Sequence, residues 1–242
     1  LNAYAGLASG YLLGDAIEDQ LMSQLGIPAE RQVPLVVQDK VFNANGSLWY
    51  PSTYETQFFA LSPSGQALPT PSLVPEFWGD TMLVNGTAFP FLPVKRGVYR
   101  FRVLNACNTR VLSLKLYFSM PGAFPNNCEP DVRAIGPELR VIGSEGGFLD
   151  GGLAPRGVIY GQKKGDPGLV LAPGERADIL IDFSGVPAGS TLILHNDAPV
   201  PFPGGTPLAD FHPGNAALPL PPTPGYGPNT RTLLQFQVGS DT

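Results

Sequence analysis

The sequence predicts an all-β sandwich or barrel that follows one short helix near the N-terminus. From residue 33 onward, short stretches of alternating apolar and polar residues are separated by clusters of Gly, Pro, Asn and Asp. Two Asn-Gly pairs, at residues 45–46 and 85–86, stand between candidate strands. With 242 residues the chain is long enough to bury one sizeable core, so a single large domain is the default expectation.

The helix is expected just before the first strand. Asp15 stands at the N-cap position, with Glu18 three residues later as its capping partner. A Gly-x-Pro sequence at residues 26–28 ends the pattern. The apolar residues of the segment are spaced by four: Ile17, Leu21 and Leu25. This pattern predicts a short linker helix.

Four stretches show the clearest two-residue alternation of strands. One face of each strand should therefore point into the core and the other away from it. Between the apolar positions of the first stretch lie Arg100 and Arg102, which we expect to point outward. The expected inward residues are Tyr99, Phe101 and Val103; Leu112, Leu114, Leu116 and Phe118; Ala177, Ile179, Ile181 and Phe183; and Leu234, Phe236 and Val238.

Turns are expected at both Asn-Gly pairs. A type I′ hairpin needs positive φ at two successive residues, which Asn and Gly tolerate best. Ser47 and Thr87 also complete N-glycosylation patterns there, but the turn requirement already accounts for the Asn-Gly pairs. Proline-rich stretches at 63–75, 121–137 and 198–228 are expected to be surface loops.

Composition excludes several function classes. The formal net charge is -5, and no run of Lys or Arg occurs, so we expect neither nucleic acid nor an anionic membrane as partner. Charged residues make up 14% of the chain, against about 25% in a typical soluble domain. Part of the surface is therefore expected to contact other protein.

Metal-ligating and nucleophilic patterns are sparse. His195 lies in a strand pattern and His212 in a loop pattern, and the sequence has no His-x-His or Cys-x-x-Cys. Because a metal site needs three or four ligands in fixed geometry, we expect no metal ligand in this chain. No G-x-S-x-G or G-x-G-x-x-G occurs, so the sequence predicts no catalytic residue. Two cysteines, Cys107 and Cys128, permit one disulfide without specifying it, and reduced, buried thiols are the alternative.

Two segments carry a resemblance to a known family: PEFWGDTMLVNGTAFPFLPVKRGVYRFRVLNACNTR at 75–110 and LVLAPGERADILIDFS at 169–184. Together with YAGLASGYLLGD at 4–15 and VIGSEGGFLD at 141–150, they resemble the multicopper oxidases, in particular the bacterial laccase, spore-coat laccase and bilirubin oxidase branch. The resemblance implies a cupredoxin-like Greek-key β-sandwich or barrel. It also implies oxidation of phenolic or similar reductants, coupled to reduction of O₂ to water.

The resemblance further implies that this chain is the central domain only. Four-copper chemistry needs about ten imidazoles and one thiolate, whereas this chain has two histidines. The copper is then expected on flanking cupredoxin domains of the same protein. Residues 1–27 would be the last strand of the preceding domain plus a linker helix, and residues 28–242 the central domain.

Position by position, the resemblance places a substrate-pocket wall above the type 1 copper on six residues: Pro75, Glu76, Phe77, Trp78, Thr109 and Val111. The alternative is that Phe77 and Trp78 are ordinary core or interface aromatics. The spore-coat laccases have a cysteine at position 78, so their disulfide does not transfer. A bridge from Cys107 to Cys128, which lies in the 122–138 insertion, stays open beside the alternative of two reduced thiols.

Two other function classes stay open on sequence alone. One is a copper-less scaffold of the same fold in the cell envelope, which flanking sequence without His-x-His pairs would indicate. The other is a stand-alone adhesion or carbohydrate-binding sandwich, which coplanar exposed aromatics would indicate. Family resemblance favours an extracytoplasmic, spore or cell-envelope location.

Overall fold

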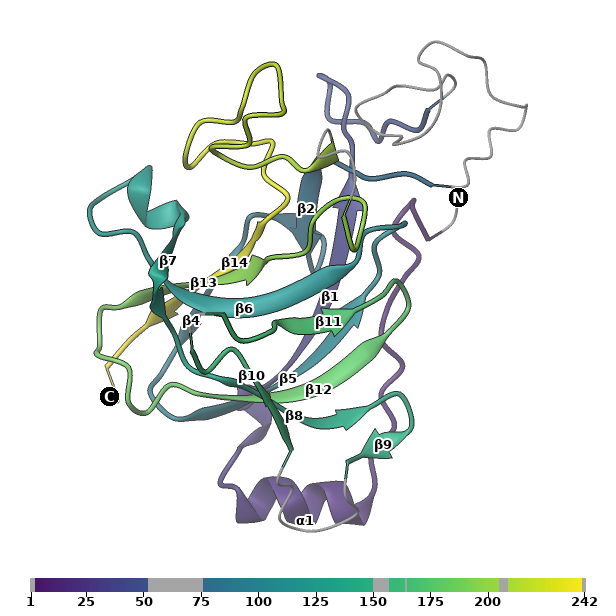
Figure 1. The fold of residues 1–242 in the computed structure, drawn as a ribbon. Helices are drawn as coiled ribbons and strands as arrows, with labels where there is room; N and C mark the ends of the chain where they lie inside the picture. Colours follow the sequence, from purple (N-terminus) through teal and green to yellow (C-terminus); the bar gives the residue numbers. More distant parts are fainter. Residues whose placement is uncertain (1–2, 52–75, 150–156, 164, 205–208, 241–242) are drawn as a thin grey trace.

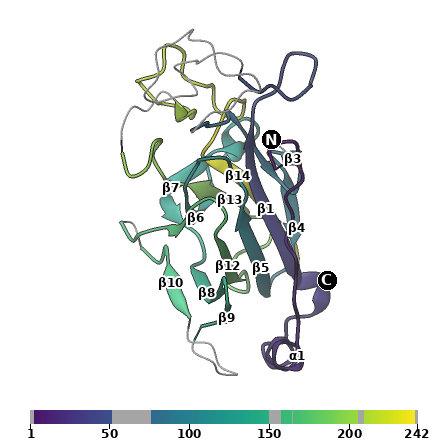
Figure 2. The ribbon, with the colours of Figure 1, turned by 90° about the vertical axis from the view of Figure 1, so that its right-hand side faces the viewer.

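Two β-sheets face each other and enclose one main core (Figures 1 and 2). The computed structural model describes residues 3–51, 76–149, 157–163, 165–204 and 209–240. The predicted loop at 63–75 therefore lies outside the described residues. Within the described residues no helix is both long and apolar enough to span a bilayer.

The first sheet has eight strands in the order β10-β8-β12-β5-β1-β2-β3, with β9 paired to β8. Its strands are β1 (Gln32–Lys40), β2 (Thr81–Val84), β3 (Thr87–Ala88), β5 (Val98–Asn105), β8 (Leu139–Ser144), β9 (Gly147–Phe148), β10 (Val158–Tyr160) and β12 (Arg176–Asp182). β1 and β5 run parallel, with Val33 opposite Phe101, and the other pairs are antiparallel.

The second sheet has six strands in the order β11-β6-β13-β14-β4, with β7 paired to β6. Its strands are β4 (Phe91–Val94), β6 (Leu112–Ser119), β7 (Pro130–Ile135), β11 (Leu169–Leu171), β13 (Thr191–Asn196) and β14 (Thr232–Val238). β14 lies between β13 and β4 and pairs in parallel with β4. β7 falls inside a stretch expected to be a loop, so that expectation was wrong there, because the segment returns along β6 and pairs with it.

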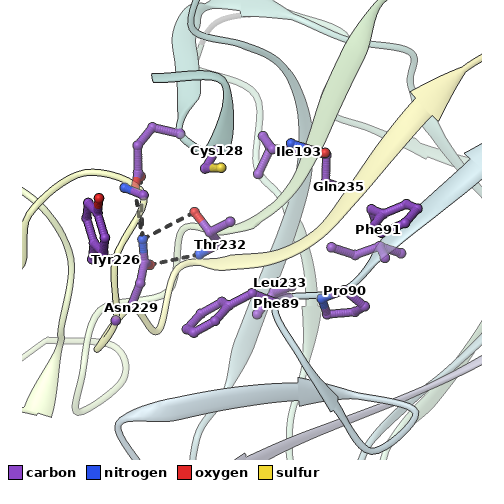
Figure 3. A pocket seen from close by; sticks show the side chains of 14 residues that line it. Phe89, Pro90, Phe91, Cys128, Ile193, Tyr226, Asn229, Thr232, Leu233 and Gln235 are labelled. Carbon is purple, nitrogen blue, oxygen red and sulfur yellow. Dashed lines mark hydrogen bonds between the residues drawn. The ribbon is translucent and has the colours of Figure 1, made fainter. Parts of the chain in front are cut away.

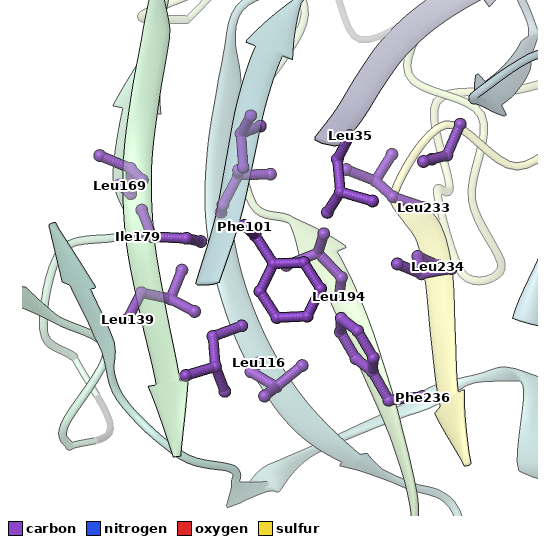
Figure 4. Close-up of a cluster of buried hydrophobic side chains, with 14 of the residues drawn as sticks. Leu35, Phe101, Leu116, Leu139, Leu169, Ile179, Leu194, Leu233, Leu234 and Phe236 are labelled. Carbon is purple, nitrogen blue, oxygen red and sulfur yellow. The ribbon is translucent and has the colours of Figure 1, made fainter. Parts of the chain in front are cut away.

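The core lies between the sheets and contains the predicted inward residues (Figure 4). Phe101 is fully enclosed and meets Phe236 of the opposite sheet at a ring-centroid distance of 5.5 Å. Burying one such side chain stabilises the fold by about 1.5–3 kcal/mol. Phe118 is the exception among the predicted residues, because it is only partly buried at the core edge.

Helix α1 (Ala16–Gln24) forms where the capping pattern predicts it, with the Asp15 side chain accepting from the Glu18 N–H at 2.8 Å. It covers the outer face of β5, so Arg100 points away from the core as expected but is buried beneath the helix. Arg100 is 2% exposed and donates to Glu18 on α1 and to Asp178 on β12. The helix is thus held to the sheet by buried ionic contacts as well as by apolar packing around Leu21.

The two Asn-Gly pairs form different turns. Asn85 and Gly86 both have positive φ, 50° and 79°, and join β2 to β3 as the I′ expectation requires. At the other pair only Gly46 has positive φ, and the Asn43 N–H donates to the Ser47 carbonyl. That turn has three loop residues and a glycine bulge instead of the expected two-residue form.

Residues 7–15 belong to no strand of the two described sheets, and Leu7, Tyr11 and Leu13 are exposed apolar residues. Cys107 and Cys128 are both free, so of the two alternatives the structure shows the reduced thiols and not the bridge. The Cys107 thiol lies in the core, 3.7 Å from the Val37 carbonyl, whereas Cys128 ends a 3₁₀ turn (η2, Asn126–Cys128) beside Asn127.

Candidate functional site

The structure brings together the two sequence segments expected to form the wall. The Phe77 N–H donates to Thr109 Oγ1 at 3.1 Å, which joins the segment before β2 to the turn after β5. Glu76 is exposed, Val111 is half-buried, and Phe77 and Trp78 are 2% and 3% exposed. Pro75 lies outside the described residues. In this chain the two aromatic residues therefore face its own interior, and Glu76 faces solvent.

Phe77 sits within a group of aromatic rings from three segments. Its ring centroid lies 5.5 Å from that of Tyr4, 5.8 Å from Tyr50 and 6.2 Å from Trp49. The Tyr4 hydroxyl donates to the Trp49 carbonyl at 2.6 Å and accepts from the Val41 N–H at 3.0 Å. Burial raises the pKa of Tyr4 to about 12, so this hydroxyl stays protonated near neutral pH. Tyr4 therefore joins the N-terminal segment to residues 41–49 and to the Phe77 ring.

Trp78 packs on the opposite side, against the long loop between β13 and β14. Its neighbours there are Val200 and Ala209, both buried. Consecutive residues thus anchor the segment in two directions, Phe77 toward the N-terminal segment and Trp78 toward the 198–228 loop.

Asp39, in β1, is the centre of the support beneath the wall. Its side chain is 0% exposed and accepts from the Gly79 N–H at 2.7 Å and the Asn108 N–H at 2.9 Å. A buried carboxylate needs such donors, because burying an unpaired charge costs several kcal/mol. Asp39 thus ties together the two segments that carry Phe77 and Thr109.

Arg110 supplies the countercharge to this carboxylate. It is fully buried, its Nε lies 3.5 Å from Asp39 Oδ2, and its Nη2 donates to the carbonyls of Gly79 at 2.6 Å and Ala209 at 3.2 Å. Nε has no hydrogen-bond partner, so the contact with Asp39 is an ion pair without a hydrogen bond. Sequence reasoning missed both residues. Asp39 could have been noticed in the sequence as an acidic residue inside the apolar strand pattern LVVQDKVF.

Each of the two histidines lies within 4 Å of a carboxylate oxygen. His195 Nε2 lies 3.4 Å from Asp197 Oδ1, and His212 Nε2 lies 3.9 Å from Asp210 Oδ2. Burial acts to raise the pKa of Asp197, but hydrogen bonds from His195 and Lys115 outweigh it and hold that pKa well below its usual range.

Copper does not fit the donor atoms that the structure describes. Within the described ranges no three His, Cys, Asp or Glu side chains gather as a metal site would require. The Cys107 thiol is fully enclosed, and burial raises its pKa, so the thiolate that a type 1 copper needs is disfavoured.

Comparison with known proteins gives consistent relatives. No family model matches the chain. A laccase from Bacillus subtilis (strain 168) is 41% identical over 199 residues, and one from Bacillus stratosphericus is 39% identical over 199 residues. Each alignment covers 82% of this chain but 31% and 32% of the respective laccase.

A solved structure agrees with these relatives. The 2F4 variant of the McoA multicopper oxidase from Aquifex aeolicus superimposes with a TM-score of 0.57 at 28% identity, over 95% of this chain and 36% of that chain. The chain belongs to the multicopper oxidase family. The expectation of a cupredoxin-like all-β fold is confirmed. The multicopper oxidase segment seen here spans about a third of the length of the laccases it matches.

Proposed function

We propose that this chain is the central, copper-free domain of a laccase-like multicopper oxidase. The parent protein oxidises phenolic or similar reductants one electron at a time and reduces O₂ to water, with its copper on flanking cupredoxin domains. This domain holds those neighbours at the required spacing and contributes to the substrate wall. Pro75, Glu76, Thr109 and Val111 would face the substrate, and the buried Phe77 and Trp78 would pack behind them. The observation that carries the proposal is that a laccase match covers 82% of this chain and only about a third of the laccase.

The buried ion pair supports the role in the wall. Phe77, Trp78 and Thr109 are fixed to the rigid first sheet through Asp39 and Arg110. A wall held by backbone hydrogen bonds keeps its shape when a flat aromatic reductant binds, which favours pre-organised recognition.

The exposed N-terminal segment supports contact with a flanking domain. Leu7, Tyr11 and Leu13 are 77%, 89% and 77% exposed. Exposed apolar side chains on a segment outside both sheets are suited to contact another domain. The relatives are laccases, and this favours an oxidase over the copper-less envelope scaffold as the parent.

Copper loading tests the proposal directly. After incubation with excess Cu²⁺ and desalting, metal analysis of the chain should give a copper-to-protein ratio near zero, with no blue absorption and no oxidase activity. A variant with His195→Asn and His212→Asn serves as the control and should give the same ratio. A reproducible one-to-one copper content that this variant abolishes would overturn the proposal. The sequence on either side of this chain distinguishes the two candidate parent proteins. His-x-His pairs and a His-Cys-His strand there would indicate an oxidase, and their absence would indicate a scaffold.

A further inference from the structure

A pocket of about 260 Å³ lies at one end of the second sheet, apart from the wall residues (Figure 3). It is lined by the start of β14, with Thr232 and Leu233, by Ile193 of β13 and by three other segments. These are residues 89–91 before and at the start of β4, residues 128–129 after the 3₁₀ turn, and residues 225–229 of the long loop. A cavity of about 150 Å³ can hold benzene, so this pocket has room for an aromatic ring with a short substituent.

Exposed aromatic side chains line the pocket. Phe89, Phe91 and Tyr226 are 40%, 62% and 55% exposed. In Figure 3 Tyr226 lies at one end of the pocket and Phe91 at the other. Three large rings left in contact with water around one hollow form an apolar surface that a ligand would cover.

The backbone at Phe89 is strained in a way that places its ring at the pocket. Its φ is 46°, in the left-handed region that a bulky side chain rarely adopts. The ring lies beside Gly227, where it would be 3.5 Å from a Cβ added to that glycine. Such conformations persist only where the surrounding structure holds them, and they gather at binding sites.

The charged group among the lining residues of the pocket is the carboxylate of Glu129. Oε1 accepts from the Gly225 N–H at 2.8 Å, and the Asn229 Nδ2 lies 3.3 Å from Oε1 and 3.4 Å from Oε2. Both donors are neutral. Burial raises the pKa of Glu129, and the nearby His195 and His212 act in the opposite direction.

Among the described residues no Lys or Arg side chain forms an ion pair with Glu129. Asp39 and Asp210 lie against arginines, and Asp197 lies against Lys115 at 2.8 Å. A half-buried carboxylate next to aromatic rings offers a cation both an opposite charge and the negative faces of the rings.

We propose that this pocket binds a small organic cation, an ammonium group carried on an aromatic or short alkyl body. The ammonium group would face Glu129, and the body would lie among Phe89, Phe91 and Tyr226. The site shares no residue with the substrate wall. Its failure would therefore leave the proposed oxidase role untouched, and copper loading does not bear on it.

Titration calorimetry with benzylammonium tests the proposal, with benzyl alcohol and benzoate as neutral and anionic probes of the same ring. At pH 7 the ammonium is expected to bind at least tenfold more tightly than the alcohol, and benzoate more weakly than either. Equal binding of the three probes, or no benzylammonium binding at millimolar concentration, would show that no cation site exists.

Variants locate the site. Glu129→Gln keeps the shape of the side chain and removes its charge. It should weaken benzylammonium binding at least tenfold and leave the affinity for benzyl alcohol unchanged. Glu30→Gln, at an exposed glutamate on a different part of the chain, is the matched control and should bind like the parent chain. Tyr226→Ala, at a half-exposed loop residue, should weaken both probes and keeps the test available if Glu129→Gln does not fold. Unchanged ammonium binding in both Glu129→Gln and Tyr226→Ala would overturn the assignment.

Discussion

Replacement of Asp39 by Asn should destabilise the chain far more than the same replacement at an exposed aspartate. The change keeps the volume but removes the charge that faces the fully buried Arg110, 3.5 Å away. It also turns one of the two acceptor oxygens into an NH₂ donor, facing either the Gly79 or the Asn108 N–H. Breaking a buried ion pair from one side costs about 3–5 kcal/mol, because the remaining charge stays uncompensated. We therefore expect the free energy of unfolding to fall by about 3–5 kcal/mol.

Equilibrium urea unfolding, followed by tryptophan fluorescence, measures this loss. Asp182→Asn, at an exposed position of β12, is the control and should change the free energy by less than about 1 kcal/mol. The double variant Asp39→Asn with Arg110→Met removes both charges and should lose less than the sum of the single variants, with a coupling of about 1.5–3 kcal/mol. A loss below about 1 kcal/mol for Asp39→Asn, or strict additivity in the cycle, would refute the reasoning.

Two further perturbations test other contacts. Glu18→Gln removes one of the two carboxylates that contact the buried Arg100. We expect the free energy of unfolding to fall by about 1–2 kcal/mol and amide hydrogen exchange to become faster across α1. Unchanged exchange in α1 would contradict the anchoring role. Gly79→Ala should destabilise the chain by more than about 2 kcal/mol in thermal unfolding, because the added Cβ would lie 2.5 Å from the Lys40 backbone nitrogen. Gly185→Ala is the control and should be nearly neutral, because no atom lies within 4 Å of its added Cβ.

Local patterns were enough to predict much of the fold. The two-residue alternation at Tyr99, Phe101 and Val103 survives as a buried stripe, because strand geometry alone decides which side chains share a face. The helix cap at Asp15 is equally local and forms as expected. By contrast, Arg100 is buried although its position in the alternation points outward, because a distant helix covers that face.

The candidate sites depended on contacts that no local pattern contains. Phe77 and Thr109 could be paired only through family resemblance, and Asp39 was recognised as their support only once the sheets were assembled. The ligand pocket joins Phe89, Glu129 and Tyr226, which are far apart in sequence and carry no spacing signal. The choice between a bridge and two free cysteines stayed open for the same reason, because it depends on where the fold places Cys107 and Cys128.

The position of β14 has a consequence for synthesis on the ribosome. This strand follows every other described strand of its sheet in the sequence, yet it lies in the interior of that sheet, hydrogen-bonded to β13 on one side and to β4 on the other. Until residues 232–238 have left the exit tunnel, both neighbours present unpaired backbone edges and the nascent chain cannot close its second layer. At this stage the nascent chain exposes strand edges that can pair with other chains. We therefore expect it to need protection from aggregation by a chaperone.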